Sequence, residues 1–151
     1  MIVLTMKRDD GGRRAAGFTG RASDCVVRAV AIAAERPYAV VYGELAEINA
    51  KMPRSRARRR SKVGSHTADH GIYTESALFK RYMVGLGFTW VPTMGIGTGC
   101  KVHLRKSELP MGRLVVSLSK HYTAVVDGVI FDTHDPQRGG TRCVYGYWRM
   151  P

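Results

Sequence analysis

Three residues of this 151-residue chain have the types and the spacing that thiol chemistry requires: Cys25, His121 and Asp132. Cys25 opens the segment Cys25 to Glu35, which is apolar on nearly every face and so predicts a buried helix with the thiol at its N-terminal end. Unpaired backbone N–H groups and the positive end of the helix dipole lower the pKa of a thiol placed there. Cys25 is therefore the candidate nucleophile, and the alternative is a small buried hydrophobe.

The base for this thiol lies on a predicted β-hairpin. A two-residue Asp-Gly turn at 127–128 pairs Thr123 with Asp132 and His121 with His134. His121 and Asp132 then share one face as diagonal neighbours, so Asp132 can fix the imidazole tautomer and stabilise the imidazolium that forms when His121 takes the thiol proton. His134 is a weaker candidate to line the same cleft.

Helices come first in the chain and strands last. The apolar periodicity predicts helices over 25–35, from Pro37 to about Met52-Pro53, and over 74–86, with Ser23-Asp24 as the cap of the first. After an early strand at 2–6, the period changes toward two from Phe88 onward, which predicts strands at 89–91, 101–104, 113–118, 122–126, 129–133 and 143–148. This order predicts an α+β fold that ends in an antiparallel meander.

The order of cysteine, histidine and aspartate on these elements resembles the papain-like cysteine peptidase superfamily. The matching stretches are Ser-Asp-Cys-Val-Val-Arg-Ala around Cys25 and His-Tyr-Thr-Ala-Val-Val-Asp-Gly-Val-Ile-Phe-Asp from His121 to Asp132. They are similar to compact bacterial and phage members of the bacteriocin-leader-peptidase kind, over residues 23–35 and 113–135.

This resemblance implies a single papain-like domain over residues 1–151. Its central helix would carry Cys25 and pack, with the other N-terminal helices, on a C-terminal antiparallel sheet. The implied activity is cleavage of a peptide, isopeptide or other amide bond in a peptide or protein substrate, by Cys25, His121 and Asp132 and without a cofactor.

The chain departs from that superfamily at the oxyanion hole. Family members place a glutamine several residues before the cysteine, but the only glutamine here is Gln137 and the only asparagine is Asn49. Thr19, Ser23 or the backbone N–H of Cys25 would have to donate instead, and one lost donor typically lowers the rate about a hundredfold or more. The sequence thus predicts either a slow or specialised thiol hydrolase or a domain that kept the fold and lost catalysis.

The net charge of +12 is concentrated in one window. Seven basic residues stand within twelve positions that contain no acid: Lys51, Arg54, Arg56, Arg58, Arg59, Arg60 and Lys62. They fall largely in a predicted exposed loop at about 53–71, and without them the net charge is about +5. The alternative function is therefore a catalytically silent domain that binds nucleic acid or an acidic protein partner non-specifically through Arg54 to Lys62.

The remaining cysteines suggest no further site. Three cysteines without a secretory signal argue against a disulfide framework, and Cys143 lies in a predicted core strand. Cys100 and His103 with His66 and His70 have zinc-like spacing, but the two pairs are thirty residues apart in glycine-rich segments that need no metal to explain them. We expect no metal and no cofactor.

The first residues argue against a membrane partner. Only five apolar residues precede the first charges, which is too short for a signal-peptide core or a membrane span. The expected location is cytoplasmic.

Overall fold

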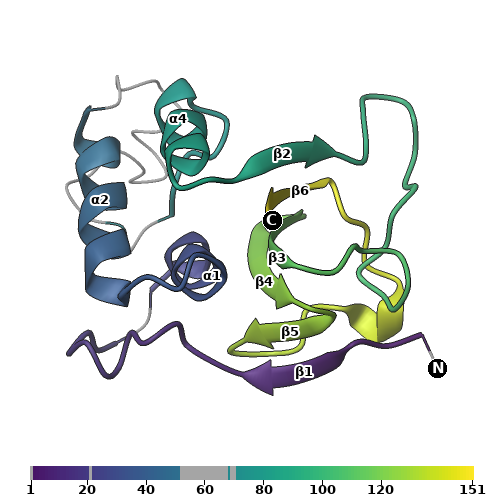
Figure 1. Cartoon of the computed structure of the whole chain (residues 1–151), viewed down its shortest axis with the longest axis horizontal. Helices are drawn as coiled ribbons and strands as arrows, with labels where there is room; N and C mark the ends of the chain where they lie inside the picture. Colours follow the sequence, from purple (N-terminus) through teal and green to yellow (C-terminus); the bar gives the residue numbers. More distant parts are fainter. Residues whose placement is uncertain (1, 21, 52–67, 69–70) are drawn as a thin grey trace.

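The computed structural model describes residues 2–20, 22–51, 68 and 71–151. These residues form three α-helices and a six-stranded mixed sheet, which confirms the predicted α+β class (Figure 1). The elements are, in chain order, β1 (Thr5–Arg8), α1 (Cys25–Ala33), α2 (Tyr38–Lys51), α4 (Ala77–Gly85), β2 (Thr89–Pro92), β3 (Arg113–Leu118), β4 (His121–Val126), β5 (Val129–Asp132), the 3-10 turn η1 (Arg138–Gly140) and β6 (Gly146–Met150).

The sheet has the strand order β1-β5-β4-β3-β6-β2, which runs from bottom to top in Figure 1. All neighbours are antiparallel except β1, which runs parallel to β5 with Thr5 opposite Val129. The expected C-terminal antiparallel sheet is therefore wrong at one edge, where the N-terminal strand β1 joins it in parallel. The N-terminal strand joins one edge and β2 the other, and such long-range pairings leave no local signal in the sequence.

Three strand predictions also differ from the structure. The early strand spans Thr5–Arg8 rather than 2–6. The segment 101–104 forms no strand, because only His103 pairs there, in an isolated bridge with Cys143. The last strand begins at Gly146 rather than at Cys143. Short β-rich segments next to glycine-rich bends do not fix their own ends.

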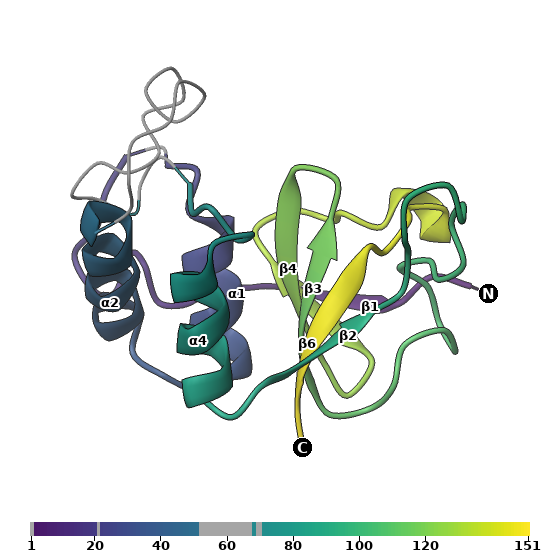
Figure 2. The ribbon, with the colours of Figure 1, turned by 90° about the horizontal axis from the view of Figure 1, so that it is seen from above.

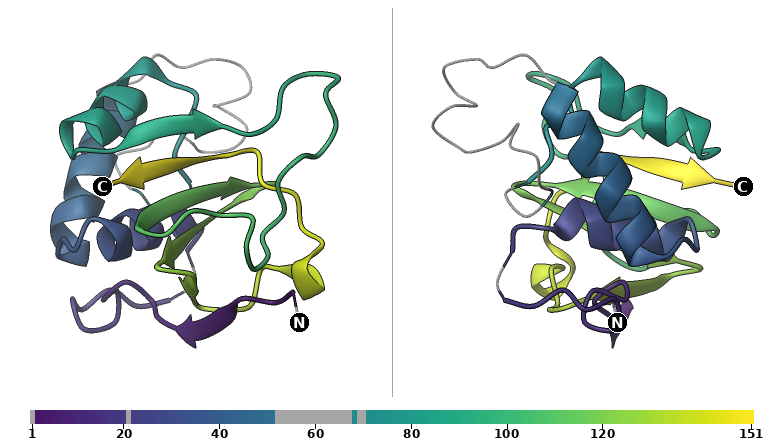
Figure 3. Two further views of the ribbon diagram at one scale, coloured as in Figure 1. Left: turned by 45° about the vertical axis from the view of Figure 1, so that its right-hand side comes forward. Right: turned by 90° about the vertical axis from the view of Figure 1, so that its left-hand side faces the viewer.

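Helix α1 lies directly against the sheet, between α2 and the strands β3 and β4 (Figures 1 and 2). Six of its nine residues are buried, as the all-round apolar pattern predicts: Val26, Val27, Ala29, Val30, Ala31 and Ala33. All three helices lie on the same side of the sheet (Figure 3). In the described residues, no helix has the length and apolar character needed to cross a bilayer.

Each face of the sheet packs its own apolar cluster. Val115, Ala124 and Trp148 point toward the helices and join a cluster that includes Val27 and Phe79. Leu114, Val116, Leu118, Val125 and Ile130 point the other way. They pack with Leu4, Leu104 and Val144, which lie outside the strands, as a second cluster. The two clusters fix the orientation of the β4–β5 hairpin relative to α1.

Candidate active site

Cys25 and His121 meet where α1 and β4 begin. Cys25 is the first residue of α1, and His121 is the first residue of β4. Burial raises the pKa of the Cys25 thiol, but a hydrogen bond with His121, its positive charge and the backbone N–H of Tyr122 outweigh this and lower that pKa below its usual value. The positive charge of Arg28 acts in the same direction. The site therefore favours the thiolate.

Asp132 holds His121 from the adjacent strand. Nε2 of His121 lies 2.7 Å from Oδ2 of Asp132, so Nδ1 is the ring nitrogen left for Cys25. Burial disfavours the imidazolium, yet the hydrogen bonds to Asp132 and Cys25 raise the pKa of His121 to about 9. The pairing of Val126 with Val129 is the register that the Asp-Gly turn predicts, and it places Thr123 opposite Asp132.

The Asp132 carboxylate is itself firmly positioned, at 3% exposure. Oδ2 accepts a hydrogen bond from Oγ1 of Thr123 at 2.7 Å, and Oδ1 accepts one from the backbone N–H of Thr133 at 2.7 Å. Burial raises the pKa of Asp132, but its hydrogen bonds to His121 and Thr123 hold it below the usual value. Asp132 therefore stays a carboxylate that accepts hydrogen bonds from His121.

The first turn of α1 is left without a side-chain cap. Asp24 stands at the N-cap position, as predicted, but its carboxylate makes no capping hydrogen bond. It pairs instead with Arg28 of the next turn and accepts a hydrogen bond from the Tyr38 hydroxyl at 2.7 Å. The Asp24 carboxylate therefore satisfies none of the backbone N–H groups in this first turn, which an α-helix leaves without intrahelical partners.

The predicted side-chain donors for an oxyanion are less suitable. Thr19 and Ser23 are both exposed in the segment before α1, and neither hydroxyl forms a hydrogen bond with another described residue. Gln137 lies elsewhere, where its amide oxygen accepts from the backbone N–H of Leu4 at 2.7 Å and its nitrogen donates to the Leu4 carbonyl. Of the three alternatives that the sequence offered, only the backbone N–H of Cys25 belongs to α1.

His134 lies at the edge of the site, with its Nδ1 3.9 Å from Oδ1 of Asp132. Its ring lies 5.0 Å from that of His121, and its side chain is 58% exposed. Donor atoms of His121, Asp132 and His134 lie within 4.8 Å of one another, a set that suits a transition metal. Nε2 of His121 and Oδ2 of Asp132 are already hydrogen-bonded to each other, so a metal would have to break the link that holds the imidazole.

The structure corrects the expectation about disulfides. Cys100 and Cys143 form a disulfide with Cα atoms 5.8 Å apart, and Cys25 has a free thiol. The bridge between His103 and Cys143 brings the two half-cystines together across 43 residues, a pairing that the sequence could not reveal. Cys143 is accordingly half-buried rather than a core thiol.

Two of the four predicted zinc ligands, Cys100 and His103, have other partners. The Cys100 sulfur is committed to the disulfide, and Nδ1 of His103 lies 3.2 Å from Oε1 of Glu108. His66 and His70 lie outside the described residues, as do the predicted polyanion contacts Arg54, Arg56, Arg58, Arg59, Arg60 and Lys62.

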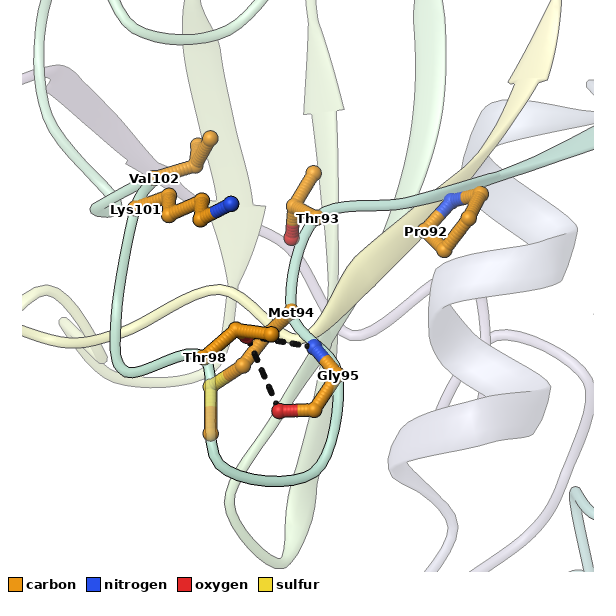
Figure 4. A pocket seen from close by; sticks show the side chains of 7 residues that line it. All are labelled: Pro92, Thr93, Met94, Gly95, Thr98, Lys101 and Val102. Carbon is orange, nitrogen blue, oxygen red and sulfur yellow. Dashed lines mark hydrogen bonds between the residues drawn. The ribbon is translucent and has the colours of Figure 1, made fainter.

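Neither of two hollows in the described surface contains the thiol. One, of about 470 Å³, lies along the loop after β2 and is lined by Pro92, Thr93, Met94, Gly95, Thr98, Lys101 and Val102 (Figure 4). Lys101 is the one charged side chain among them, and neither His121 nor Asp132 lines this hollow. The other, of about 50 Å³, lies beside Tyr122 and has room for a small group.

The sequence did not indicate which residues contact the carboxylates of Asp132 and Asp24. The register predicted from the Asp-Gly turn places Thr123 opposite Asp132, and this pairing is the feature of the sequence that indicates their hydrogen bond. Tyr38 and Arg13, which lie near Asp24, gave no such signal, because their meeting depends on how α2 and the N-terminal segment pack against α1.

Comparisons of the chain with protein-family models, with curated proteins and with solved structures gave no match.

Proposed function

We propose that this chain is a thiol hydrolase of the papain-like type, which cleaves a peptide, isopeptide or other amide bond. One observation carries the proposal: Cys25, His121 and Asp132, from three different elements, form a continuous hydrogen-bonded series at the N-terminal end of a buried helix. A lone buried cysteine would need neither a histidine partner nor an aspartate behind that histidine.

The proposed reaction starts with the Cys25 thiolate and the His121 imidazolium. The sulfur attacks the carbonyl carbon of the amide, and its oxygen takes up the negative charge and accepts hydrogen bonds from the N–H groups of the first turn of α1. The tetrahedral intermediate collapses, the C–N bond breaks, and His121 gives its proton to the departing amine. The product of this half is a thioester on Cys25.

Water completes the cycle. His121, now neutral, removes a proton from a water molecule, which attacks the thioester carbon. The C–S bond breaks, the acid product leaves, and the Cys25 thiolate and the His121 imidazolium are restored. Asp132 stays ionised throughout and keeps Nδ1 of His121 directed at the sulfur.

Alkylation of Cys25 tests the proposed pair directly. Under non-reducing conditions Cys25 has the only free thiol, because the other two cysteines are bonded to each other. We expect iodoacetamide to form a thioether at Cys25 with a pH midpoint below that of an ordinary thiol, and His121→Ala to raise this midpoint. An ordinary midpoint that His121→Ala leaves unchanged would contradict the proposal.

Hydrolysis needs its own test, because a reactive thiol need not be an enzyme. The protein is incubated with a proteome-derived peptide library, and new N-termini are counted by mass spectrometry against Cys25→Ala. Cleavage above that variant, with a thioester on Cys25 in rapidly acid-quenched samples, supports the proposal. Equal counts for the two proteins, measured on a sample whose Cys25 alkylates with the expected midpoint, would overturn hydrolysis.

A further inference from the structure

A half-buried arginine joins the two halves of the candidate site. Arg28 lies on α1, one turn after Cys25, and its side chain is 13% exposed. Its Nη1 pairs with the carboxylate of Asp24 at the start of the same helix, and its Nη2 lies 3.7 Å from Oδ1 of Asp132 at the end of β5. One guanidinium thus bridges two carboxylates that are 2% and 3% exposed and come from different layers of the fold.

Further contacts hold the Asp24 end of this bridge and the backbone of Arg28. Asp24 accepts a hydrogen bond from the Tyr38 hydroxyl and lies 3.6 Å from Nη1 of Arg13. On the backbone side, a Cβ at Gly11 would lie 3.0 Å from Cα of Arg28, so the N-terminal segment packs closely against this turn of α1. The guanidinium has little freedom to leave either carboxylate.

We propose that Arg28 is a positioning residue, which holds the start of α1 and the end of β5 so that Cys25 and His121 can share a proton. This inference rests on the proposed function of Cys25. Arg28 acts through Asp24, the neighbour of Cys25, and through Asp132, the partner of His121. A planar fork with several donors suits two carboxylates at once, as the single ammonium of a lysine does not.

The charge of Arg28 also sets the direction of the pH effect. Removing a positive charge near both groups disfavours the thiolate and favours the imidazolium, so the pKa values of Cys25 and His121 should both rise. The other titratable and charged groups around Arg28, its two carboxylates and Cys25 stay in place: His121 on β4, Asp132 on β5, His134 after it, Asp24 at the N-cap of α1, Tyr38 on α2 and Arg13 in the N-terminal segment.

The test measures the pH midpoint of Cys25 alkylation by iodoacetamide, together with the melting temperature. We expect Arg28→Met to raise the midpoint by about one pH unit and to slow labelling below the midpoint about tenfold. Arg28→Lys keeps the charge but loses the fork, and we expect it to raise the midpoint by less than half as much. It also provides a second, milder variant should Arg28→Met fail to fold.

Two matched controls separate positioning from general damage. Val41→Ala, in a fully buried position on α2, should lower the melting temperature and leave the midpoint unchanged. Arg36→Met removes a positive charge that pairs with Glu44 at 3.0 Å, away from the site. This substitution should also leave the midpoint of Cys25 alkylation unchanged.

An unchanged midpoint in both Arg28 variants, with a lowered melting temperature, would show a purely structural arginine and overturn the inference. Failure of the proposed function looks different, because the unsubstituted protein would then already label with the midpoint of an ordinary thiol.

Discussion

Nε2 of His121 lies 2.7 Å from Oδ2 of Asp132, on the adjacent strand of a tight hairpin. Nδ1 is thereby left for Cys25 at the start of α1. Because the aspartate is buried and accepts further hydrogen bonds, it stabilises a positive charge on the imidazole near neutral pH. The same contact determines both the orientation and the protonation of His121.

Asp132→Asn should test the charge of this contact without changing its shape. The amide oxygen can still accept from Nε2 of His121, but it no longer stabilises the imidazolium. We expect the rate of Cys25 alkylation at pH 6 to fall about tenfold. The control is Asp135→Asn, because Asp135 accepts from the backbone N–H of Gln137 instead. An equal fall in both variants would contradict a specific role for Asp132.

Thr123→Val should show how much the second hydrogen bond to Asp132 contributes. The substitution removes the donor 2.7 Å from Oδ2 and keeps the shape of the side chain. We expect the free energy of unfolding to fall by about 1 kcal/mol and alkylation of Cys25 to slow only a few-fold. Thr133→Val is the matched control, since its hydroxyl lies 3.5 Å from Oδ1 of Asp132 and its loss should matter less. Urea unfolding measures the free energies of the two variants, and iodoacetamide labelling measures the rates of Cys25 alkylation.

The raised pKa of His121 makes stability depend on pH with a definite sign. Its pKa is about 9 in the folded chain and about 6.5 otherwise, so His121 stabilises the fold fully below pH 6.5, and this contribution is lost as pH rises toward 9. Cys25 acts oppositely, because its lowered pKa stabilises the fold above the pKa of an unfolded thiol and this is lost as pH falls. The two effects partly cancel between pH 6.5 and 9.

Cys25→Ser removes the opposing effect of the thiol and leaves the part of the His121 contribution that Asp132 supplies. We expect the free energy of unfolding of Cys25→Ser to fall from pH 6 to pH 9 more steeply than that of the unsubstituted chain. Adding His121→Gln should flatten the dependence. Urea unfolding at pH 6, 7.5 and 9 gives the pH dependence of the unfolding free energy for each protein. The same pH dependence in all three proteins would contradict a raised pKa of His121 in the folded chain.

Gly146→Ala should disrupt the packing of the β2 edge. A Cβ at Gly146 would overlap the indole of Trp90, which crosses this position, and would lie 3.0 Å from the Val91 carbonyl oxygen. We expect a loss of about 1–3 kcal/mol of unfolding free energy. Gly43→Ala is the control of opposite sign, because a Cβ there meets nothing within 4 Å and alanine favours the α2 helix by about 0.5–1 kcal/mol. Thermal and urea unfolding compare the two.

The disulfide should stabilise the fold without taking part in the chemistry. It closes a loop of 43 residues, so Cys100→Ser with Cys143→Ser should lower the free energy of unfolding by about 4 kcal/mol. The pH midpoint of Cys25 alkylation should stay unchanged. Mass spectrometry of the unfolded chain should count one alkylated cysteine without reductant and three with it, and three without reductant would contradict the disulfide.

Local patterns were sufficient for most of the elements. The apolar run after Cys25 predicts α1, and the strand at 113–118 has the observed bounds. The Asp-Gly turn predicts the hairpin register, because a two-residue loop admits one pairing and alternation then puts His121 and Asp132 on the same face. These predictions depend on residues within about a dozen positions of one another.

By itself, then, the sequence determined the helix that carries Cys25 and the hairpin that carries His121 and Asp132. Only the tertiary structure decided that the thiol meets the imidazole, that Arg28 reaches across to Asp132 and that Cys100 bonds to Cys143. The same holds for the parallel pairing of β1 with β5. Each of these contacts joins segments far apart in the chain, and its geometry depends on how whole layers pack rather than on any local preference.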